Sequence, residues 1–415
     1  MSRLSAVFLF TLFLLPLSRP GMAEDVLVPP GIGTLAEAVA NASDGDVLLL
    51  QDGAFGLTED LVIDKALTLR ALRRIEQPLL SGGTIIVQAP DKQVTLQGLG
   101  FSVPLVLNAG AAVRILENDF LSGYIDGANY RTDQGDGELA IIGNHLVNGS
   151  IYNIHALDAY IAGNTLDNGI IQGDAPAWVV GNLLRVNYAT FAVNFQAANG
   201  QIRVIGNRIE FGAGTSSGYG IHAQSPLVFV AGNIVRFLAR DGYALGIYVS
   251  GSAYSRVINN VIDGGGALTS SGSQGIVGPR YVAGNIVTGF NVGTPLSLDA
   301  AVSSVANLCF GNDNDSACGA RAVLADPDFV DREDYRLNAG SPAIDAGPDL
   351  PQFSDLDRSR NDIGVHGGPW AIDQYDAQRD PANVGRPLVF PLFTLGEVIA
   401  DGSVRARALG VARLR

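Results

Sequence analysis

The chain of 415 residues carries 41 acidic against 27 basic residues, which gives a formal net charge of −14. This balance excludes the usual nucleic-acid-binding proteins, because recognition of a phosphate backbone needs a basic face. The charged fraction of 16% and the 51 glycines instead favour stacked coils, in which like charges repeated every ~4.8 Å would repel one another.

Residues 1–23 have the features of a secretory signal peptide. Arg3 precedes a mostly apolar run over residues 4–17, and a small-residue cleavage site follows at Ala23. The run is too short to span a bilayer easily, and no later segment has an uninterrupted apolar stretch of that length. We therefore expect a secreted or periplasmic protein with no membrane span in its mature form. Its formal charge falls from −14 to −16 when Arg3 and Arg19 are removed.

The mature chain is expected to begin with a short helix that covers the first coil. Residues 34–37 (TLAE) match a capping box, and apolar residues follow at helical spacing until Asp44 and Gly45 end the pattern. Short apolar strands are predicted directly afterwards, over residues 47–50, 61–63 and 67–69. Because the open end of a strand stack exposes core and strand edges, a helix in this place suits an end cap.

One short phrase then recurs seven times: an apolar pair, Gly-Asn or Asn-Asn, one further residue and an apolar residue. The asparagines of these copies are Asn144, Asn164, Asn182, Asn207, Asn233, Asn260 and Asn285. Degenerate copies place Asn118 before them and Asn307 after them. Successive asparagines lie 18 to 27 residues apart, a period typical of stacked coils.

Each copy predicts a strand followed by a sharp corner, because β-branched pairs favour strands and Gly or Asn can adopt a left-handed backbone. Asparagines at the same corner of successive coils would lie ~4.8 Å apart and form a hydrogen-bonded ladder. Their predicted role is therefore structural. The residue two positions after each asparagine is apolar, from Phe120 to Cys309. We predict that these residues form a column that points into the core. We predict an all-β solenoid of roughly 10 coils between residues 47 and 308.

The character of the chain changes after Asn307. Cys309 and Cys318 are the only cysteines, and their closeness in an exported chain predicts a disulfide. The alternative is that Cys309 is simply a small core residue. The predicted organisation is a solenoid with its N-terminal cap over residues 24–310 and an acidic segment over residues 311–385 that packs on it.

Residues 386–415 are expected to form C-terminal β-strands. The clearest strands are at residues 392–399 and 404–408, with a turn at residues 401–402. The terminal arginines, including Arg407 and Arg413, are expected on exposed strand faces.

Several segments of the chain resemble a known superfamily. The stretches GDVLLLQDG and LVIDKALTLRAL, followed by the Gly-Asn coils, are similar to the right-handed parallel β-helix (pectate-lyase-like) superfamily. Residues 334–337 (DYRL) and 340–347 (GSPAIDAG) resemble a C-terminal tail of secreted bacterial β-helix proteins. The resemblance implies the fold; it does not imply one reaction, because the superfamily includes lyases, hydrolases, epimerases and adhesins.

On such a solenoid, ligands bind along one outward strand face, and the candidate strand lies 8–13 residues before each corner. Its outward polar residues form a predicted polysaccharide-binding strip: Asn153, His155, Gln172, Asn194, Gln196 and Gln224. Tyr219, Tyr243 and Tyr248 are available to stack on pyranose faces. The alternative is that these polar residues form an ordinary solvent-facing surface that binds no ligand.

The residues of the coils limit the reaction types. Hydrolysis needs two carboxylates across a sugar, and the central coils offer only scattered acids. Lys65 and Lys92 are the only lysines and lie in early coils, so a lysine-based lyase is unsupported.

The remaining candidate catalytic set is His222 as base, Tyr219 or Tyr248 as acid, and Arg280 for the substrate carboxylate. The leading hypothesis is an exported β-helix protein that binds polysaccharide and processes it as a uronate lyase or epimerase. The alternative is a non-catalytic surface, matrix or adhesion solenoid.

Residues 312–315 (NDND) place oxygen ligands at alternate positions, as calcium loops do. Asp313 and Asp315 are the candidate Ca²⁺ ligands. A solvated loop held by the cysteine pair would explain the same pattern.

Overall fold

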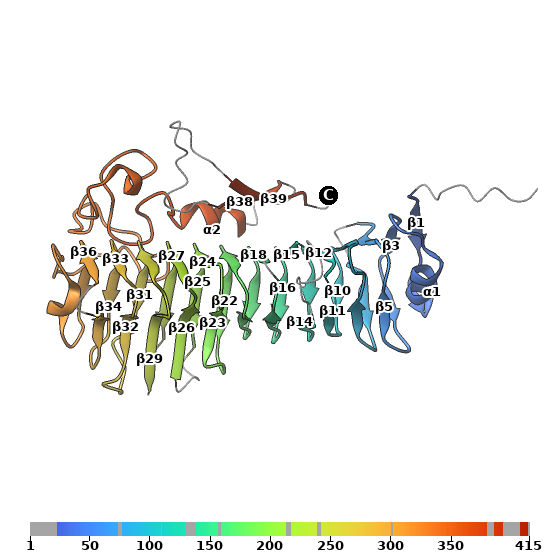
Figure 1. Cartoon of the computed structure of the whole chain (residues 1–415), viewed down its shortest axis with the longest axis horizontal. Coiled ribbons are helices and arrows are strands. Elements are labelled where there is room, and N and C mark those ends of the chain that lie inside the picture. The colour runs from blue at the N-terminus through green and yellow to red at the C-terminus, as the bar shows by residue number, and fades with distance from the viewer. Residues whose placement is uncertain are drawn as a thin grey trace, which may run out of the picture.

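Parallel strands stacked along one axis form most of the described chain between Asp25 and Phe310 (Figure 1). The computed structural model describes residues 23–73, 77–108, 110–129, 138–156, 159–212, 217–238, 242–299, 302–379, 386–392 and 407–413. Within them, two parallel sheets of 13 strands and one of 11 run side by side. The predicted parallel β-helix is confirmed. The predicted signal peptide, apart from Ala23, and the turn at residues 401–402 lie outside the described residues.

Each complete coil passes once through the three sheets, so its strands are short. Sheet A consists of β1 (Asp25–Val28), β3 (Val47–Leu50), β6 (Thr68–Ala71), β9 (Gln93–Gln97), β12 (Ala112–Leu116), β15 (Leu139–Ile142), β18 (Ala159–Ala162), β21 (Ala177–Val180), β24 (Gln201–Ile205), β27 (Leu227–Ala231), β30 (Tyr254–Ile258), β33 (Tyr281–Ala283) and β36 (Ser303–Val305). Sheet B consists of β2 (Gly31–Ile32), β4 (Ala54–Gly56), β7 (Leu79–Ser81), β10 (Gly100–Phe101), β13 (Asp119–Phe120), β16 (His145–Val147), β19 (Thr165–Asp167), β22 (Leu183–Val186), β25 (Arg208–Phe211), β28 (Ile234–Phe237), β31 (Val261–Asp263), β34 (Ile286–Thr288) and β37 (Leu308–Phe310). Sheet C consists of β5 (Leu61–Ile63), β8 (Ile85–Val87), β11 (Leu105–Asn108), β14 (Ile125–Asn129), β17 (Ile151–Ile154), β20 (Ile171–Gly173), β23 (Phe191–Gln196), β26 (Ser217–Gln224), β29 (Tyr243–Ser250), β32 (Gln274–Val277) and β35 (Thr294–Ser297).

The Gly-Asn phrase forms the corner between sheets A and B. Its glycines have φ angles from 62° to 68°, a left-handed backbone that strains residues with a Cβ. Its asparagines are buried, and each Nδ2 donates to the Oδ1 of the next asparagine at 2.9–3.0 Å, from Asn118 to Asn307. The predicted asparagine ladder is confirmed.

The inward column predicted two positions after each asparagine is also confirmed. Its members are fully buried and are register partners in adjacent coils: Phe120, Leu146, Leu166, Leu184, Ile209, Val235, Ile262, Val287 and Cys309. Apolar side chains at equivalent positions of successive coils therefore stack along the axis, and each added coil buries one more of them.

At the N-terminal end, helix α1 (Thr34–Asn41) packs its buried Leu35 and Val39 against the core of the first coils. The predicted capping box is wrong: the helix follows Gly33, and no side chain caps it. Thr34 instead directs its Oγ1 back to the Gly31 carbonyl oxygen, 3.3 Å away. At the other end of α1, Lys65 Nζ donates to three backbone carbonyls at 2.8–3.0 Å, which stabilises the helix C-terminus.

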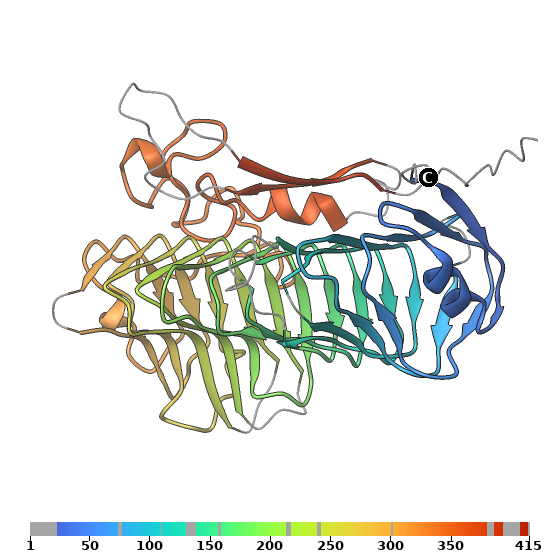
Figure 2. The same ribbon diagram turned by 45° about the vertical axis from the view of Figure 1, so that its right-hand side comes forward.

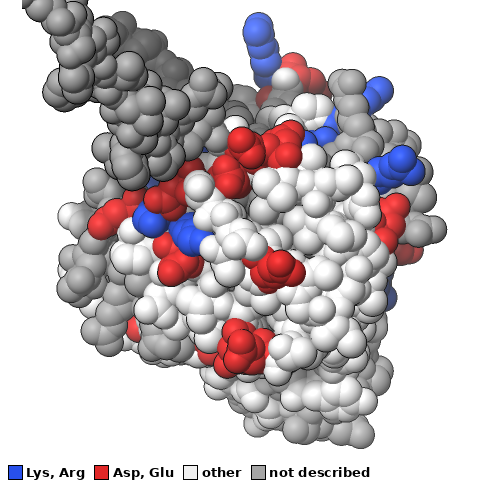
Figure 3. Space-filling view, turned by 90° about the vertical axis from the view of Figure 1, so that its right-hand side faces the viewer, with Lys and Arg blue, Asp and Glu red and all other residues white. Residues whose placement is uncertain are grey.

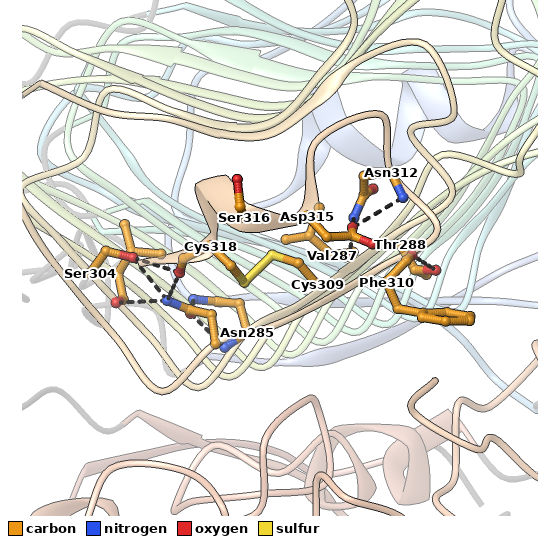
Figure 4. Close-up of a disulfide and its surroundings, with 12 residues drawn as sticks. Asn285, Val287, Thr288, Ser304, Cys309, Phe310, Asn312, Asp315, Ser316 and Cys318 are labelled. Atoms are coloured by element: carbon orange, nitrogen blue, oxygen red, sulfur yellow. Dashed lines mark hydrogen bonds between the residues drawn. A yellow bond between two sulfur atoms is a disulfide. The ribbon is translucent and has the colours of Figure 1, made fainter. Parts of the chain in front are cut away.

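At the C-terminal end, Cys309 of β37 is joined to Cys318 by a disulfide, with a Cα–Cα distance of 5.9 Å (Figure 4). Cys318 ends the short 3-10 helix η2 (Asp315–Cys318). Asn307 is the last asparagine of the ladder in the described chain, and its Nδ2 donates to Ser304 Oγ at 3.1 Å. The disulfide loop therefore covers the last coil of the ladder.

The chain beyond the disulfide, called the tail here (residues 319–413), lies along sheets A and B (Figures 1 and 2). It contains the 3-10 helix η3 (Pro351–Phe353), α2 (Asp373–Arg379), β38 (Leu388–Leu392) and β39 (Arg407–Val411). Trp370, Tyr375 and Phe390 of the tail are buried against outward residues of sheet A, including Trp178 and Phe229. A second apolar cluster joins the tail to sheet B.

The C-terminal strands differ from their predicted positions. Residues 388–392 pair antiparallel with residues 407–411, and most of the predicted strand at residues 392–399 lies outside the described residues. The expectation of an exposed Arg413 is wrong. Its side chain is only 10% exposed, and its Nε lies 3.4 Å from Glu117 Oε1, because the tail folds back onto the corner between sheets A and B.

No helix in the described part of the chain is both long and apolar enough to cross a membrane.

The N-terminal end of the molecule carries scattered charged side chains, and much of the face in view carries none (Figure 3). This agrees with the low charged fraction of the sequence.

Candidate functional site

Sheet C is the sheet whose outward face the described tail leaves uncovered. The apolar contacts of the described tail involve residues of sheets A and B. In Figure 1 the tail lies along the top with sheet A, and the strands of sheet C lie along the bottom. The candidate site therefore lies on sheet C.

Strand register places the outward side chains of sheet C in rows. The His222 row contains Gln172, Asn194, His222, Tyr248, Val277 and Ser297. The Tyr219 row contains Phe191, Tyr219, Leu245, Gln274 and Thr294. Gln196, Gln224 and Ser250 form a third, shorter row.

The first two rows both face outward although their members are three residues apart in the chain. In β26 the two intervening residues, Gly220 and Ile221, both face the core: Ile221 is fully buried, and a Cβ on Gly220 would lie 2.4 Å from Val235 Cγ1. Strict alternation would separate Tyr219 and His222 onto opposite faces. The extra inward residue, which acts as a bulge, brings both side chains outside.

Five rings from three successive coils meet at this place and form the aromatic cluster: Phe191, Tyr219, His222, Tyr243 and Tyr248. Phe191 stacks on Tyr219 with a centroid distance of 4.7 Å. His222 stacks on Tyr248 at 4.9 Å and lies 5.8 Å from Phe191. Tyr243 is tilted against Tyr219 at 5.9 Å. The cluster is an outward aromatic surface of the kind that packs against sugar rings.

His222 is held as a neutral ring within this cluster. Its two ring nitrogens are buried and have no hydrogen-bond partner among the described residues. Burial lowers the pKa of His222 below its ordinary value, because desolvation disfavours the imidazolium. A general base must touch the proton that it removes, so His222 needs a change of side-chain position before it can act as one.

One tyrosine of the cluster, Tyr243, has a shifted pKa. Burial, together with the neighbouring Tyr219, raises the pKa of the Tyr243 phenol. Further along sheet C, Tyr124 and Tyr152 form a second pair with a centroid distance of 5.1 Å. Burial and the hydrogen bond with Tyr124 raise the pKa of Tyr152.

The structure brings together some of the predicted site residues and separates others. Gln172 and Asn194 lie in the His222 row, and Gln196 and Gln224 lie in the third row. Asn153 has a left-handed φ of 55°, and its Nδ2 donates to Asp126 Oδ1 at 3.0 Å.

His155 follows the end of β17, and its Nδ1 contacts Asp174. Asn153 and His155 are therefore occupied by local contacts outside the rows.

Arg280 does not lie in the catalytic set that the sequence predicted. Strand β32 ends at Val277, which takes the outward position beside Tyr248. Arg280 lies in the turn before β33, where its Nη1 is 3.9 Å from Asp299 Oδ2. Arg280 lies only five residues before Asn285, closer to the corner than the 8–13 residues that place a side chain on sheet C.

The candidate calcium loop is held by its own hydrogen bonds. Asp315 accepts from the backbone N–H groups of Gly311 and Asn312 at 3.1 Å and from Asn312 Nδ2 at 2.7 Å (Figure 4). These hydrogen bonds hold the loop closed around the Asp315 carboxylate. Calcium binding by Asp313 and Asp315 stays a prediction, tested by thermal unfolding with and without millimolar calcium.

The sequence interpretation missed Phe191, Tyr124 and Tyr152. The signal for Phe191 is a repeated pattern of outward residue, small residue, apolar residue, outward residue. It occurs at residues 191–194, 219–222, 245–248, 274–277 and 294–297. Aligning these segments would have placed Phe191 beside Tyr219.

The chain is a parallel β-helix protein. Its structure resembles that of the pectate lyase Pel9A, with a TM-score of 0.42 and 13% identity over 83% of this chain and 96% of that chain. It also resembles that of a mutant form of the PL6 family alginate lyase AlyGC, with a TM-score of 0.36 and 12% identity over 84% of this chain and 58% of that chain. No family model and no curated protein matches the sequence. At these identities the likeness concerns the fold, and neither activity is transferred to this chain.

Proposed function

We propose that this protein is exported and binds polysaccharide along the outward face of sheet C. The observation that carries the proposal is the aromatic cluster, in which Phe191, Tyr219, His222, Tyr243 and Tyr248 gather on the sheet that the described tail leaves uncovered. Aromatic rings pack on the apolar faces of pyranoses, and the neighbouring amides of Gln172 and Asn194 suit sugar hydroxyls. Export rests on the predicted signal peptide.

Binding is tested by sedimenting the mature protein with insoluble polysaccharides and by titrating it with soluble ones. We expect retention on at least one glycan and weaker retention of the Phe191→Ala variant. A matched control is Phe310→Ala, because Phe310 is a partly buried residue of sheet B. Equal retention of both variants and the parent would place binding elsewhere and overturn the proposal.

A second candidate function is elimination or epimerisation at a uronate. The neighbouring rings of His222, Tyr219 and Tyr248 favour it, since a His base and a Tyr acid can share a proton transfer at the sugar C5. The ultraviolet absorbance of an unsaturated uronate tests elimination, and C5 proton exchange in D₂O tests epimerisation. A signal that His222→Ala abolishes would support catalysis. Absence of either signal with all acidic glycans would contradict catalysis and leave binding as the proposed function.

A further inference from the structure

The strands of sheet C are almost free of charge. Among the described residues, its 11 strands contain one Asp, Asp126, and no Glu, Lys or Arg. Asp126 is engaged by Asn153. The face with the aromatic cluster therefore presents rings, amides and hydroxyls.

The low charge is specific to this sheet. On sheet B, register partners in five successive coils alternate in sign: Asp167, Arg185, Glu210, Arg236 and Asp263. Arg185 Nη1 lies 2.7 Å from Asp167 Oδ1. The coils therefore tolerate charges when the signs alternate, and the uncharged rows of sheet C are not a general consequence of stacking.

Among the described residues, the two lysines and Arg280 are committed to contacts outside these rows. Lys65 holds the end of α1, and Lys92 Nζ lies 3.1 Å from Asp44 Oδ1. Arg280 lies outside the rows beside Asp299. His222 is neutral in its buried position.

From this distribution we infer that the glycan bound on sheet C is uncharged and rich in hydroxyls, not a polyuronate. The inference rests on the proposed function of glycan binding, narrows its substrate class, and argues against the second candidate function, which needs a uronate. A polyuronate would bring one carboxylate per sugar to a face without a described cation, on a protein of net charge −14, and would lose the solvation of those carboxylates without a partner. Neutral sugars need only ring stacking and hydrogen bonds, which the rows offer.

Affinity electrophoresis in native gels tests the inference with the whole mature protein. Gels contain either neutral glycans (xyloglucan, mixed-linkage β-glucan, galactomannan) or acidic ones (polygalacturonate, alginate), each at low and high salt. We expect retardation by at least one neutral glycan that salt leaves unchanged, because screening affects charged contacts only. Tyr219→Ala should weaken this retardation about threefold to tenfold.

Tyr254→Ala is the matched control, since Tyr254 is 74% exposed and lies on sheet A. Its retardation should equal that of the parent. Salt-sensitive retardation by acidic glycans alone would overturn the inference and leave the proposed function standing. No retardation in any gel would overturn both. Circular dichroism of Tyr219→Ala confirms that the variant is folded.

Discussion

At the scale of single residues, the ladder asparagines have the strictest environment in the molecule. Asn207 is fully buried. Its Oδ1 accepts from both nitrogens of Asn182, while its own Nδ2 donates to Asn233 Oδ1 and to the Val179 carbonyl at 2.8–2.9 Å. One amide therefore satisfies groups in three coils, which no apolar side chain of similar size can do.

We expect Asn207→Ala to lower the free energy of unfolding by about 3 kcal/mol or more. The substitution leaves the Asn182 donors and the Val179 carbonyl without this partner in the core, and each buried unsatisfied group costs about 1–3 kcal/mol. Chemical denaturation measures the change. Asn199→Ala is the control, because Asn199 is exposed. Equal stabilities of the two variants would contradict the ladder as a stabilising element.

His222 predicts a pH dependence of stability. Its pKa in the folded state lies below the ordinary value of 6.5, so the unfolded state takes up this proton first as the pH falls. The folded protein therefore loses stability on acidification below about pH 6.5, and none from this group above it.

The variant His222→Phe keeps an aromatic ring and has no proton to bind. We expect its melting temperature relative to the parent to be higher at about pH 5 than at about pH 8. Differential scanning calorimetry at both pH values measures this difference. An identical difference in melting temperature between variant and parent at both pH values would show that burial does not shift the pKa of His222.

At the scale of elements, one column of residues at the corner between sheets A and B explains how the tail is held. This corner column consists of the residues that directly precede the ladder asparagines. Most members are glycines with a left-handed backbone, and the exceptions are Glu117, Asn259 and Ala306, with φ angles of 51–53°. Glu117 lies beside Arg413 of the tail. Asn259 Nδ2 donates to Asn361 Oδ1 and to the carbonyls of Asp362 and Gly364 at 2.8–3.2 Å. Two of the three departures from glycine therefore contact the tail through their side chains.

The glycines of the same column admit the tail by their lack of a side chain. A Cβ on Gly163 would lie 2.2 Å from the Phe390 ring, and a Cβ on Gly206 would lie 2.2 Å from the Tyr375 ring. These positions need glycine for two reasons, the backbone conformation and the close approach of the tail.

We expect Asn259→Gly to loosen the tail while leaving the solenoid intact. Glycine suits the corner backbone, but the variant loses the hydrogen bonds to the tail, worth about 1–2 kcal/mol together, which corresponds to about 5- to 30-fold more opening. Limited proteolysis should cut the tail faster, with the main unfolding transition unchanged. Ala306→Gly, at a corner with no side-chain bond to the tail, should be cut at the parental rate. Equal rates for Asn259→Gly and the parent would contradict the role of Asn259.

At the scale of the whole molecule, the solenoid has different covers at its two ends. Helix α1 packs on the first coils, and the disulfide loop follows the last ladder asparagine. Because each coil contacts mainly its neighbours, loss of one cover should act first on the coils beside it.

Replacing both Cys309 and Cys318 by alanine should lower stability by roughly 2–3 kcal/mol through the opened loop. Hydrogen exchange should rise in β34–β37 and stay unchanged in β3–β9. Reduction of the unmodified protein is the companion measurement, since it keeps both side chains. A uniform rise along the chain would show that the solenoid unfolds as one unit.

The local repeat determined the coils, the ladder and the inward column, because each depends on residues close together in sequence that recur at one corner. The same reasoning found His222, Asn194 and Gln172 on the outward face. It misplaced Asn153, whose backbone is left-handed, and Arg280, which follows the end of β32. It missed Phe191, since an extra inward residue changes which side chains face out and only strand pairing settles the register. The position of the tail, and with it the sheet left uncovered, depended on contacts more than 100 residues apart, such as Asn259 with Asn361. Distant packing of this kind leaves no periodic signal in the sequence, so only the tertiary structure showed that the tail leaves the outward face of sheet C uncovered.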